Sequence, residues 1–450
     1  MSILKRFALT TSVLGLSLAA CTGAMAQKVS LKDAVNFGLS NNPEYGIVAN
    51  TRMATEKELD QARGLLRPSV DLSGDLGLEY TDDPNTRAGV DPDDTETLFR
   101  SQIGITLTQL LFDGFASQSE IERQAARVRS SAYRVEETAE FVALDITEAY
   151  LEVLRQRELL DIARDNIRVH TDIMQQTQDA VMAGRATDAD LAQVDARLSR
   201  ARATEADVRQ ALRNAESIYK RETGELPGEL ELSPVPIHMI AETVEDAVDI
   251  SLVEGPTVKI FEADIDVAEA ELKASEASFY PEYNLQLDAL GARDVGGVEG
   301  DDGSARALVT LNWNLYRGGI DTARRKEFIY RRATAKEQRN ENARATEDDV
   351  RQTWAAMIAQ GDRAREFVIQ AQANGRIVNA YRDQFELGRR TLLDVLDAQN
   401  EHFVSRSNTV NAEYLEMLAM YRLLSLQGDL VDSLGADMPR EASLQELSVE

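Results

Sequence analysis

The side chains that most often carry out chemistry are scarce in this sequence, which has three histidines and one cysteine among 450 residues. His170 and His402 fall in predicted helices without a second ligand at metal-binding spacing, and His238 lies far from both along the chain. The lone Cys21 has no partner for a disulfide. An active site needs such groups in combination. We therefore expect no enzymatic activity, no metal and no cofactor.

The N-terminal segment predicts export from the cytoplasm. Two basic residues precede an apolar run over 7–20, and Ala-Met-Ala at 24–26 is typical of a cleavage site. We expect residues 1–26 to be a signal peptide, so that the mature chain has no cysteine. A second possibility stays open, because Cys21 follows a Leu-Ala-Ala stretch that resembles a lipoprotein cleavage box and would then carry a lipid.

Charge and hydropathy exclude several classes of protein. The formal net charge of −28 repels nucleic-acid phosphates, so DNA and RNA are not expected partners. Removal of residues 1–26 takes two of the 49 basic residues and none of the 77 acidic ones, which brings the charge to −30. After residue 26, no stretch approaches the ~20 apolar residues of a membrane-spanning helix. Any passage through a bilayer must therefore use strands.

The chain contains two copies of one pattern. Gly114 and Gly184 recur 204 residues later as Gly318 and Gly388. Nearer the N-terminus the spacing is 213 residues, as Asp33-Ala34-Val35, Leu39, Pro43, Pro68 and Leu72 match Asp246-Ala247-Val248, Leu252, Pro256, Pro281 and Leu285. The difference predicts an insertion in the Asp-rich segment 81–97 of the first copy. The expected divisions are a first repeat over 27–223, a second over 224–434 and a polar, disordered tail over 435–450.

Each copy contains two segments with the two-residue period of a β-strand. In the first segment, Leu72, Leu76 and Leu78 alternate with polar residues such as Asp71 and Asp75. Every segment has one apolar face and the length that a tilted strand needs to cross hydrocarbon. The predicted strands cover about 69–80 and 99–110 in the first copy and about 282–290 and 305–315 in the second.

Four such strands cannot form a closed membrane barrel by themselves. An open strand edge finds no hydrogen-bond partner in lipid, and the smallest single-chain barrels have about eight strands. The pattern therefore requires an oligomer, with eight strands from a dimer or twelve from a trimer. A soluble β-sandwich is the alternative for these strands, although the flanking helices supply no second sheet for the apolar face.

Long helices make up the rest of each copy. No proline or glycine lies between Gly114 and Gly184, and the 69 residues would form a helix about 100 Å long. Apolar residues recur there every seven positions, as in a coiled coil, and again 204 residues later. The two seams are Ala139, Ile146, Val153, Leu160, Ile167, Met174 and Val181, and Ala343, Val350, Met357, Ala364, Ala371, Val378 and Phe385. We expect long helices over 115–183 and 320–387, and return helices over 185–222 and 389–426. Each return helix would stack end to end on a 24-residue helix of the other copy.

The order of these features resembles the TolC family of trimeric outer-membrane channel proteins. The resemblance covers about Val29 to Leu434 and rests on the double repeat, the prolines before the strands, Gln-Leu-Leu-Phe-Asp-Gly at 109–114 and the segment 388–398. It implies a mostly α-helical fold with a membrane β-barrel, in which three chains form twelve strands continued by an α-helical cylinder. It also implies a location in the outer membrane of a Gram-negative bacterium, with extension into the periplasm.

The resemblance further implies a passive export duct that docks with a periplasmic adaptor (membrane fusion protein) and an inner-membrane transporter. Such ducts serve type I protein secretion or multidrug efflux, and the Phe112-Asp113-Gly114 turn is more similar to the secretion subgroup. The alternative function is a periplasmic coiled-coil scaffold or adaptor with a small soluble β domain.

In this family, aspartates on the helix after the second hairpin tip narrow the periplasmic entrance, and Asp394 and Asp397 match them here. The two residues are one turn apart on one face of a predicted helix. Three copies would form two stacked acidic rings that favour cations. For Asp394, interaction with the helix dipole is the structural alternative, whereas Asp397 lies too deep in the helix for capping.

The family also has a polar latch between neighbouring hairpins at the closed tip. The matching residues here are Asp190 on the first hairpin and Arg390, two residues after Gly388. Phe385 replaces the family's tip tyrosine and lacks its hydroxyl, so we expect a weaker or differently composed latch. Solvated surface charges are the alternative for Asp190 and Arg390. Gly184 and Gly388 would form the adaptor-contacting tips, and helix ends that need a positive φ also explain both glycines.

Overall fold

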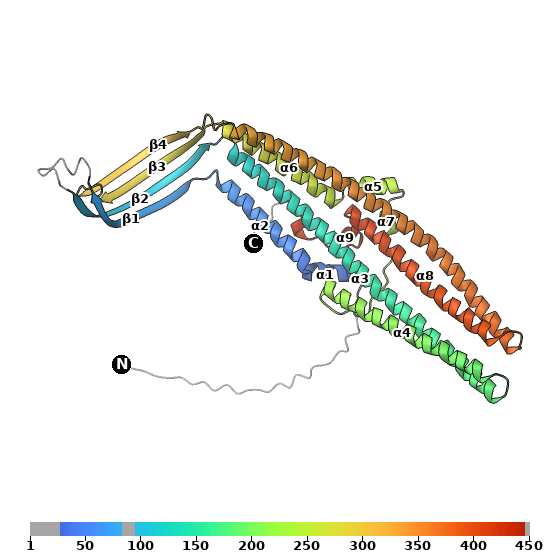
Figure 1. The fold of residues 1–450 in the computed structure, drawn as a ribbon. Helices are drawn as coiled ribbons and strands as arrows, with labels where there is room; N and C mark the ends of the chain where they lie inside the picture. The colour runs from blue at the N-terminus through green and yellow to red at the C-terminus, as the bar shows by residue number, and fades with distance from the viewer. Residues whose placement is uncertain (1–27, 83–94, 446–450) are drawn as a thin grey trace, which may run out of the picture.

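The computed structural model describes residues 28–82 and 95–445 (Figure 1). Within these residues the chain is mostly helical, with one four-stranded sheet at one end and two helical hairpins at the other. This architecture confirms the predicted class, in which long helices continue from a small group of strands. The predicted signal peptide, the lipidation alternative at Cys21 and most of the acidic insertion lie outside the described residues.

The two copies have the same order of elements. The first consists of α1 (Leu31–Asn41), α2 (Pro43–Gly64), β1 (Ser69–Thr81), β2 (Glu96–Phe112), α3 (Ala116–Met182) and α4 (Asp188–Thr223). The second consists of α5 (Val244–Val253), α6 (Pro256–Glu276), β3 (Glu282–Arg293), β4 (Asp301–Asn312), α7 (Ile320–Glu386) and α8 (Leu392–Gln427). The long helices α3 and α7 both have 67 residues, and α4 and α8 both have 36. A short α9 (Leu430–Ser433) and single 3-10 turns complete the described chain.

The sheet is antiparallel with the order β1-β2-β3-β4, so β1 and β4 are its edges. Its apolar face is uncovered in the single chain, where Leu76 and Leu78 are 75% and 78% exposed. β4 ends at Asn312, three residues before the expected end at 315. Asn312 pairs with Glu282, and the preceding Pro281 has no N–H with which to extend the ladder.

The helices form a layer that runs from the sheet to the tips (Figure 1). α3 packs against α2 and α6 near the sheet, and against α4 and α8 near the tips, while α7 packs against α6 and α8. None of the predicted seam residues is exposed, which confirms the heptad pattern as a packing surface. Close approach is possible because several of these residues are alanines.

The end-to-end partners of the return helices differ from the prediction. α8 stacks on α6 of the same copy, and a Cβ added to Gly428 would lie 3.0 Å from Pro256 Cδ. α4 likewise ends beside α1, where a Cβ at Gly38 would lie 3.6 Å from the Glu222 carbonyl oxygen. The expectation that the partner comes from the other copy was therefore wrong. The glycine at the end of α8, with φ of 82°, leaves room for the proline ring that begins α6.

The C-terminal segment is ordered against the rest of the chain up to residue 445, which corrects the prediction of a disordered tail over 435–450. The Asp437 N–H donates to Asn36 Oδ1 at 3.0 Å, and the Tyr45 hydroxyl donates to Glu441 at 2.7 Å. Polar composition suggested disorder, but hydrogen bonds to α1 and α2 satisfy these polar groups. Residues 446–450 lie outside the described chain.

The turn that begins α3 depends on Gly114. Its φ is 69°, and a Cβ at this position would lie 2.7 Å from the Ala277 carbonyl oxygen at the end of α6. Any other residue would therefore be both strained and too close to that carbonyl. Asp113 accepts a hydrogen bond from the Ser117 N–H at 2.7 Å, which satisfies one free donor at the start of the helix.

Candidate functional site at the hairpin tips

Both hairpins turn on a glycine in the left-handed region. Gly184 and Gly388 have φ of 67°, and nothing lies within 4 Å of a Cβ built on either. At the first tip the Arg185 N–H donates to the Ala180 carbonyl at 2.8 Å, which closes the end of α3. The second tip repeats this bond 204 residues later and at the same length. The predicted requirement for positive φ at the two tips is thus confirmed.

Asp190 and Asp394 occupy the same position in the two return helices. Each forms a capping box, in which the carboxylate accepts from the hydroxyl of the N-cap threonine, Thr187 or Thr391, at 2.8 Å. Hydrogen bonds from the Thr187 N–H and hydroxyl lower the pKa of Asp190. Those from the Thr391 hydroxyl and N–H likewise lower the pKa of Asp394. Both carboxylates therefore stay ionised, and both stabilise a helix start in the single chain.

Asp397 has a partner that the sequence did not predict. Arg197 of α4 donates from Nη2 to Asp397 Oδ1 at 2.7 Å. The two residues are 200 positions apart, so no local pattern connects them. Asp394 and Asp397, expected to act alike, therefore differ in their partners within one chain: the first binds its own helix terminus and the second binds the other hairpin.

Arg390 stays within its own hairpin. Its guanidinium lies over the Tyr381 ring, 4.2 Å from the centroid, and Nε donates to Gln384 at 3.0 Å. Nη1 lies 4.0 Å from Asp394. Within the described part of one chain, no hydrogen bond or ion pair joins Arg390 to Asp190, so a latch between them is not formed inside a single subunit.

Phe385 contributes an apolar contact between the two hairpins. It packs against a buried cluster drawn from three helices. The cluster consists of Ile173 of α3, Val194 of α4, and Leu392 and Leu396 of α8. The absence of a hydroxyl at Phe385 therefore suits its surroundings, and this contact depends on shape and apolar area.

A further ion pair joins the two hairpins through α3 and α8. Asp165 of α3 accepts from Arg406 Nη1 of α8 at 2.7 Å. Burial raises the pKa of Asp165, but hydrogen bonds from Arg406 and Arg168 outweigh that effect and lower it. The sequence offered no signal for this pair, because its residues lie in different copies and at positions that are not related by the repeat.

The histidines contribute no reactive group to this region. His170 is buried, its Nδ1 lies 2.9 Å from the Asn166 carbonyl oxygen, and burial lowers its pKa. Burial also lowers the pKa of His402. Across residues 28–82 and 95–445, no group of three or more His, Cys, Asp or Glu side chains is placed to hold a metal ion.

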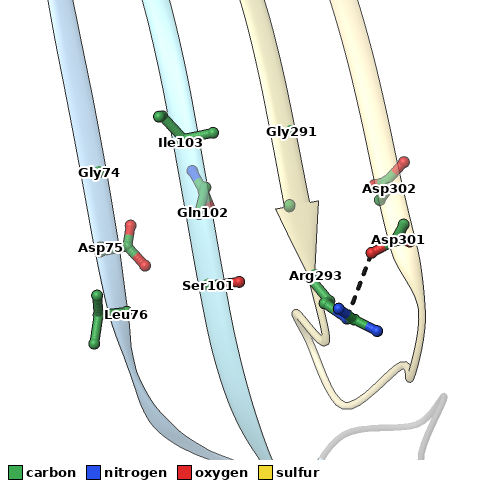
Figure 2. Close-up of a pocket in the computed structure, with 11 residues that line it drawn as sticks. Gly74, Asp75, Leu76, Ser101, Gln102, Ile103, Gly291, Arg293, Asp301 and Asp302 are labelled. Atoms are coloured by element: carbon green, nitrogen blue, oxygen red, sulfur yellow. Dashed lines mark ion pairs between the residues drawn. The ribbon is translucent and has the colours of Figure 1, made fainter.

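A shallow hollow of about 680 Å³ lies against the sheet, far from the tips (Figure 2). Several of its lining residues are small, among them Gly74, Ser101 and Gly291, and the lining residues Arg293 and Asp301 form an ion pair at 3.5 Å. Its lining contains no histidine or cysteine that could serve as a base or nucleophile.

In the described ranges, no helix is both long and apolar enough to cross a membrane.

Known proteins share both this sequence pattern and this fold. The family described as outer membrane efflux protein matches residues 38–218 and 247–429. The outer membrane efflux protein BepC of Brucella suis is 25% identical over 74% of this chain and 73% of its own length. The alkaline protease secretion protein AprF of Pseudomonas aeruginosa is 22% identical over 89% and 85%. The outer membrane protein TolC of Escherichia coli is 21% identical over 93% and 86%.

Solved structures have the same fold. The match to CusC has a TM-score of 0.77 with 14% identity and covers 90% of this chain and 92% of the other. The match to the outer membrane protein VceC of Vibrio cholerae has a TM-score of 0.74 with 14% identity and covers 91% and 97%. At this identity the likeness concerns the fold alone.

The chain belongs to the outer membrane efflux protein family, and the resemblance to TolC is confirmed. It is a channel protein of the outer membrane of a Gram-negative bacterium, extends into the periplasm, and is of the kind used in efflux and secretion. Membership of this family decides against the alternative of a periplasmic coiled-coil scaffold or adaptor.

Proposed function

We propose that three copies of this chain assemble into an export duct through the outer membrane and periplasm. The observation that carries the proposal is the sheet, whose edges β1 and β4 have no partner within the described chain and whose apolar face is exposed. Pairing β1 of one copy with β4 of the next removes every open edge, as lipid requires. Three copies then supply the twelve strands of a membrane barrel.

The surface of α7 supports the same assembly. Ile329, Ile358 and Ile369 are exposed on this helix and are separated by about eight and about three whole turns. An apolar stripe of this kind on a long helix indicates a second packing surface. In the proposed trimer it faces the helices of the next copy, so that the helical layers close into a cylinder.

The hairpin tips are the proposed docking surface for a periplasmic adaptor and an inner-membrane transporter. Each tip exposes a large apolar side chain beside its glycine, Met182 in the first and Leu387 in the second. The duct would serve type I protein secretion or multidrug efflux, since relatives of both kinds match. Cross-linked pull-down of the inner-membrane partner would separate the two, because a secretion transporter and a drug pump differ in composition.

The entrance is proposed to lie between the α7–α8 hairpins of the three copies. Asp394 and Asp397 would contribute two acidic rings there, and a low dielectric would make their field stronger than in water. Arg390 of one copy would meet Asp190 on the neighbouring copy's first hairpin and hold the tips closed, while Phe385 would contribute the apolar contact beside this latch within its own chain.

Electrophoresis of the detergent-extracted protein tests the assembly. We expect a trimer band in unheated samples and a monomer band after boiling, with the protein found in the outer-membrane fraction. A monomer recovered from the periplasm without detergent would contradict the proposal.

A further inference from the structure

One ion pair links the candidate entrance to the first hairpin of the same chain. The 2.7 Å contact between Arg197 and Asp397 joins α4 to α8, with side-chain exposures of 26% and 54%. In the described ranges, no other ion pair joins these two helices. The pair is therefore both accessible to solvent and specific to one arrangement of the hairpins.

The position of the pair is set by the apolar contact beneath it. Val194 lies one turn before Arg197 on α4, and Leu396 directly precedes Asp397 on α8. Both are fully buried members of the cluster that holds the hairpins together. Separation of the hairpins would consequently break the apolar contact and the ion pair together.

Arg197 is the charged group that faces this junction from α4. His170 of α3 lies near Arg197. Its burial is the main cause that lowers its pKa, and the positive charge of Arg197 acts in the same direction. His170 therefore stays neutral and does not compete with Arg197 for Asp397. Asp394, in contrast, is bound to Thr391 of its own helix terminus and keeps its charge in either arrangement.

We propose that Arg197 makes the charge of the Asp397 ring conditional on the position of the hairpins. While α8 lies against α4, Arg197 neutralises Asp397 and the entrance carries the Asp394 charges alone. When the α7–α8 hairpin moves away from α4, Asp397 is released and the entrance gains a second acidic ring. Arg197 is thus a positioning residue for ion selectivity, an inference that rests on the proposed trimeric entrance.

Reversal potentials of the purified, full-length trimer in planar bilayers under a KCl gradient test this inference. We expect Arg197→Gln to raise the ratio of potassium to chloride permeability at least about twofold, the scale of one partly exposed ion pair. The double variant R197Q/D397N should return to the wild-type ratio. Exchange of the two charges, in R197D/D397R, re-forms the pair and should also return the ratio to the wild-type value.

Arg200→Gln is the matched control, because it removes the same charge one turn further along α4, at an exposed residue that forms no ion pair with the described part of the chain. It should leave the ratio unchanged. If R197Q behaves like R200Q while R197Q/D397N has a lower ratio than R197Q, Asp397 faces the entrance but Arg197 does not control it, and the inference is overturned. If R197Q and R197Q/D397N have equal ratios, Asp397 does not face the ion path, and the proposed entrance fails with it.

Discussion

Glu140 is a residue whose ionisation depends on the fold. Its side chain is 0% exposed, and its carboxylate accepts the N–H groups of Leu430 and Val431 at 3.0 and 3.1 Å. Burial raises its pKa from 4.5 to about 8, although the two hydrogen bonds act in the opposite direction. The folded chain therefore binds this proton more tightly than the unfolded chain. Its contribution to the free energy of unfolding is present below pH 4.5 and is lost as the pH rises to about 8.

Glu140→Gln should remove this dependence on pH. A neutral amide cannot titrate, and its NH2 replaces one of the two oxygens that accept the N–H groups, so the variant should lose about 1–3 kcal/mol of stability. Thermal unfolding of detergent-solubilised protein between pH 5 and pH 9 measures the effect. We expect a flatter profile than in the wild type, whereas Glu148→Gln, at an exposed position of the same helix, should keep the wild-type slope. An unchanged slope in Glu140→Gln would show that another group titrates.

The paired change Asp394→Ala with Asp397→Ala tests the acidic entrance. We expect a larger single-channel conductance and a weaker preference for cations, because both rings lose their charge. Thr391→Ala is the control for capping, since it removes the hydroxyl that binds Asp394, at a cost of about 1 kcal/mol, and keeps the charge. Unchanged bilayer currents in the paired variant would discard the entrance assignment.

At the scale of elements, the C-terminal segment 435–445 acts as a strap across α1 and α2. Its hydrogen bonds reach Asn36 and Tyr45, and its Gln445 carbonyl accepts from Arg52 at 3.5 Å. The Arg52 side chain is fully buried and forms an ion pair with Glu56 at 3.0 Å. Removal of the strap would expose this pair to water and break the Tyr45 contact. The strap therefore holds the helices that lead into β1.

A chain that ends at Leu434 should have looser α1 and α2 helices. The lost hydrogen bond to the Glu441 carboxylate alone accounts for about 2 kcal/mol of local stability. Hydrogen–deuterium exchange should be faster in residues 31–64 and unchanged in the strands. A chain that ends at Gln445 keeps every one of these contacts and should exchange like the full chain. Equal protection of residues 31–64 from exchange in both truncations would mean that the strap does not stabilise α1 and α2.

At the scale of the whole molecule, stability depends on surfaces that one chain leaves uncovered. Leu76 lies near the middle of β1 on the exposed apolar face, and Ser73 lies on the opposite face. In the proposed barrel, Leu76→Arg places a charge in lipid at a cost of about 2–4 kcal/mol. We expect less trimer in the outer membrane, whereas Ser73→Arg points into the water-filled bore and should assemble normally. Quantitative immunoblotting of membrane fractions compares the two, and equal yields would contradict the assigned faces.

Properties of neighbouring residues were predictable from the sequence. The strands, the long helices, the coiled-coil seams and the glycine tips were expected near the places where they lie, because periodicity and local backbone preference specify them. At Asp394, an interaction with the helix dipole was expected as the structural alternative, but the capping box with Thr391 was not. The equivalent box at Asp190 was also missed, although each threonine lies three residues before its aspartate.

Contacts between distant segments were decided only by the tertiary structure. Arg197 meets Asp397, Glu140 meets the start of α9, and the C-terminal strap meets Tyr45. The residues of these pairs are 200, 290 and 396 positions apart in the sequence. Periodicity shows which face of a helix is apolar but not which helix covers it, as the exchanged stacking partners of α4 and α8 demonstrate. Several helices could cover the same apolar stripe equally well, and the fit of the packed side chains selects one of them.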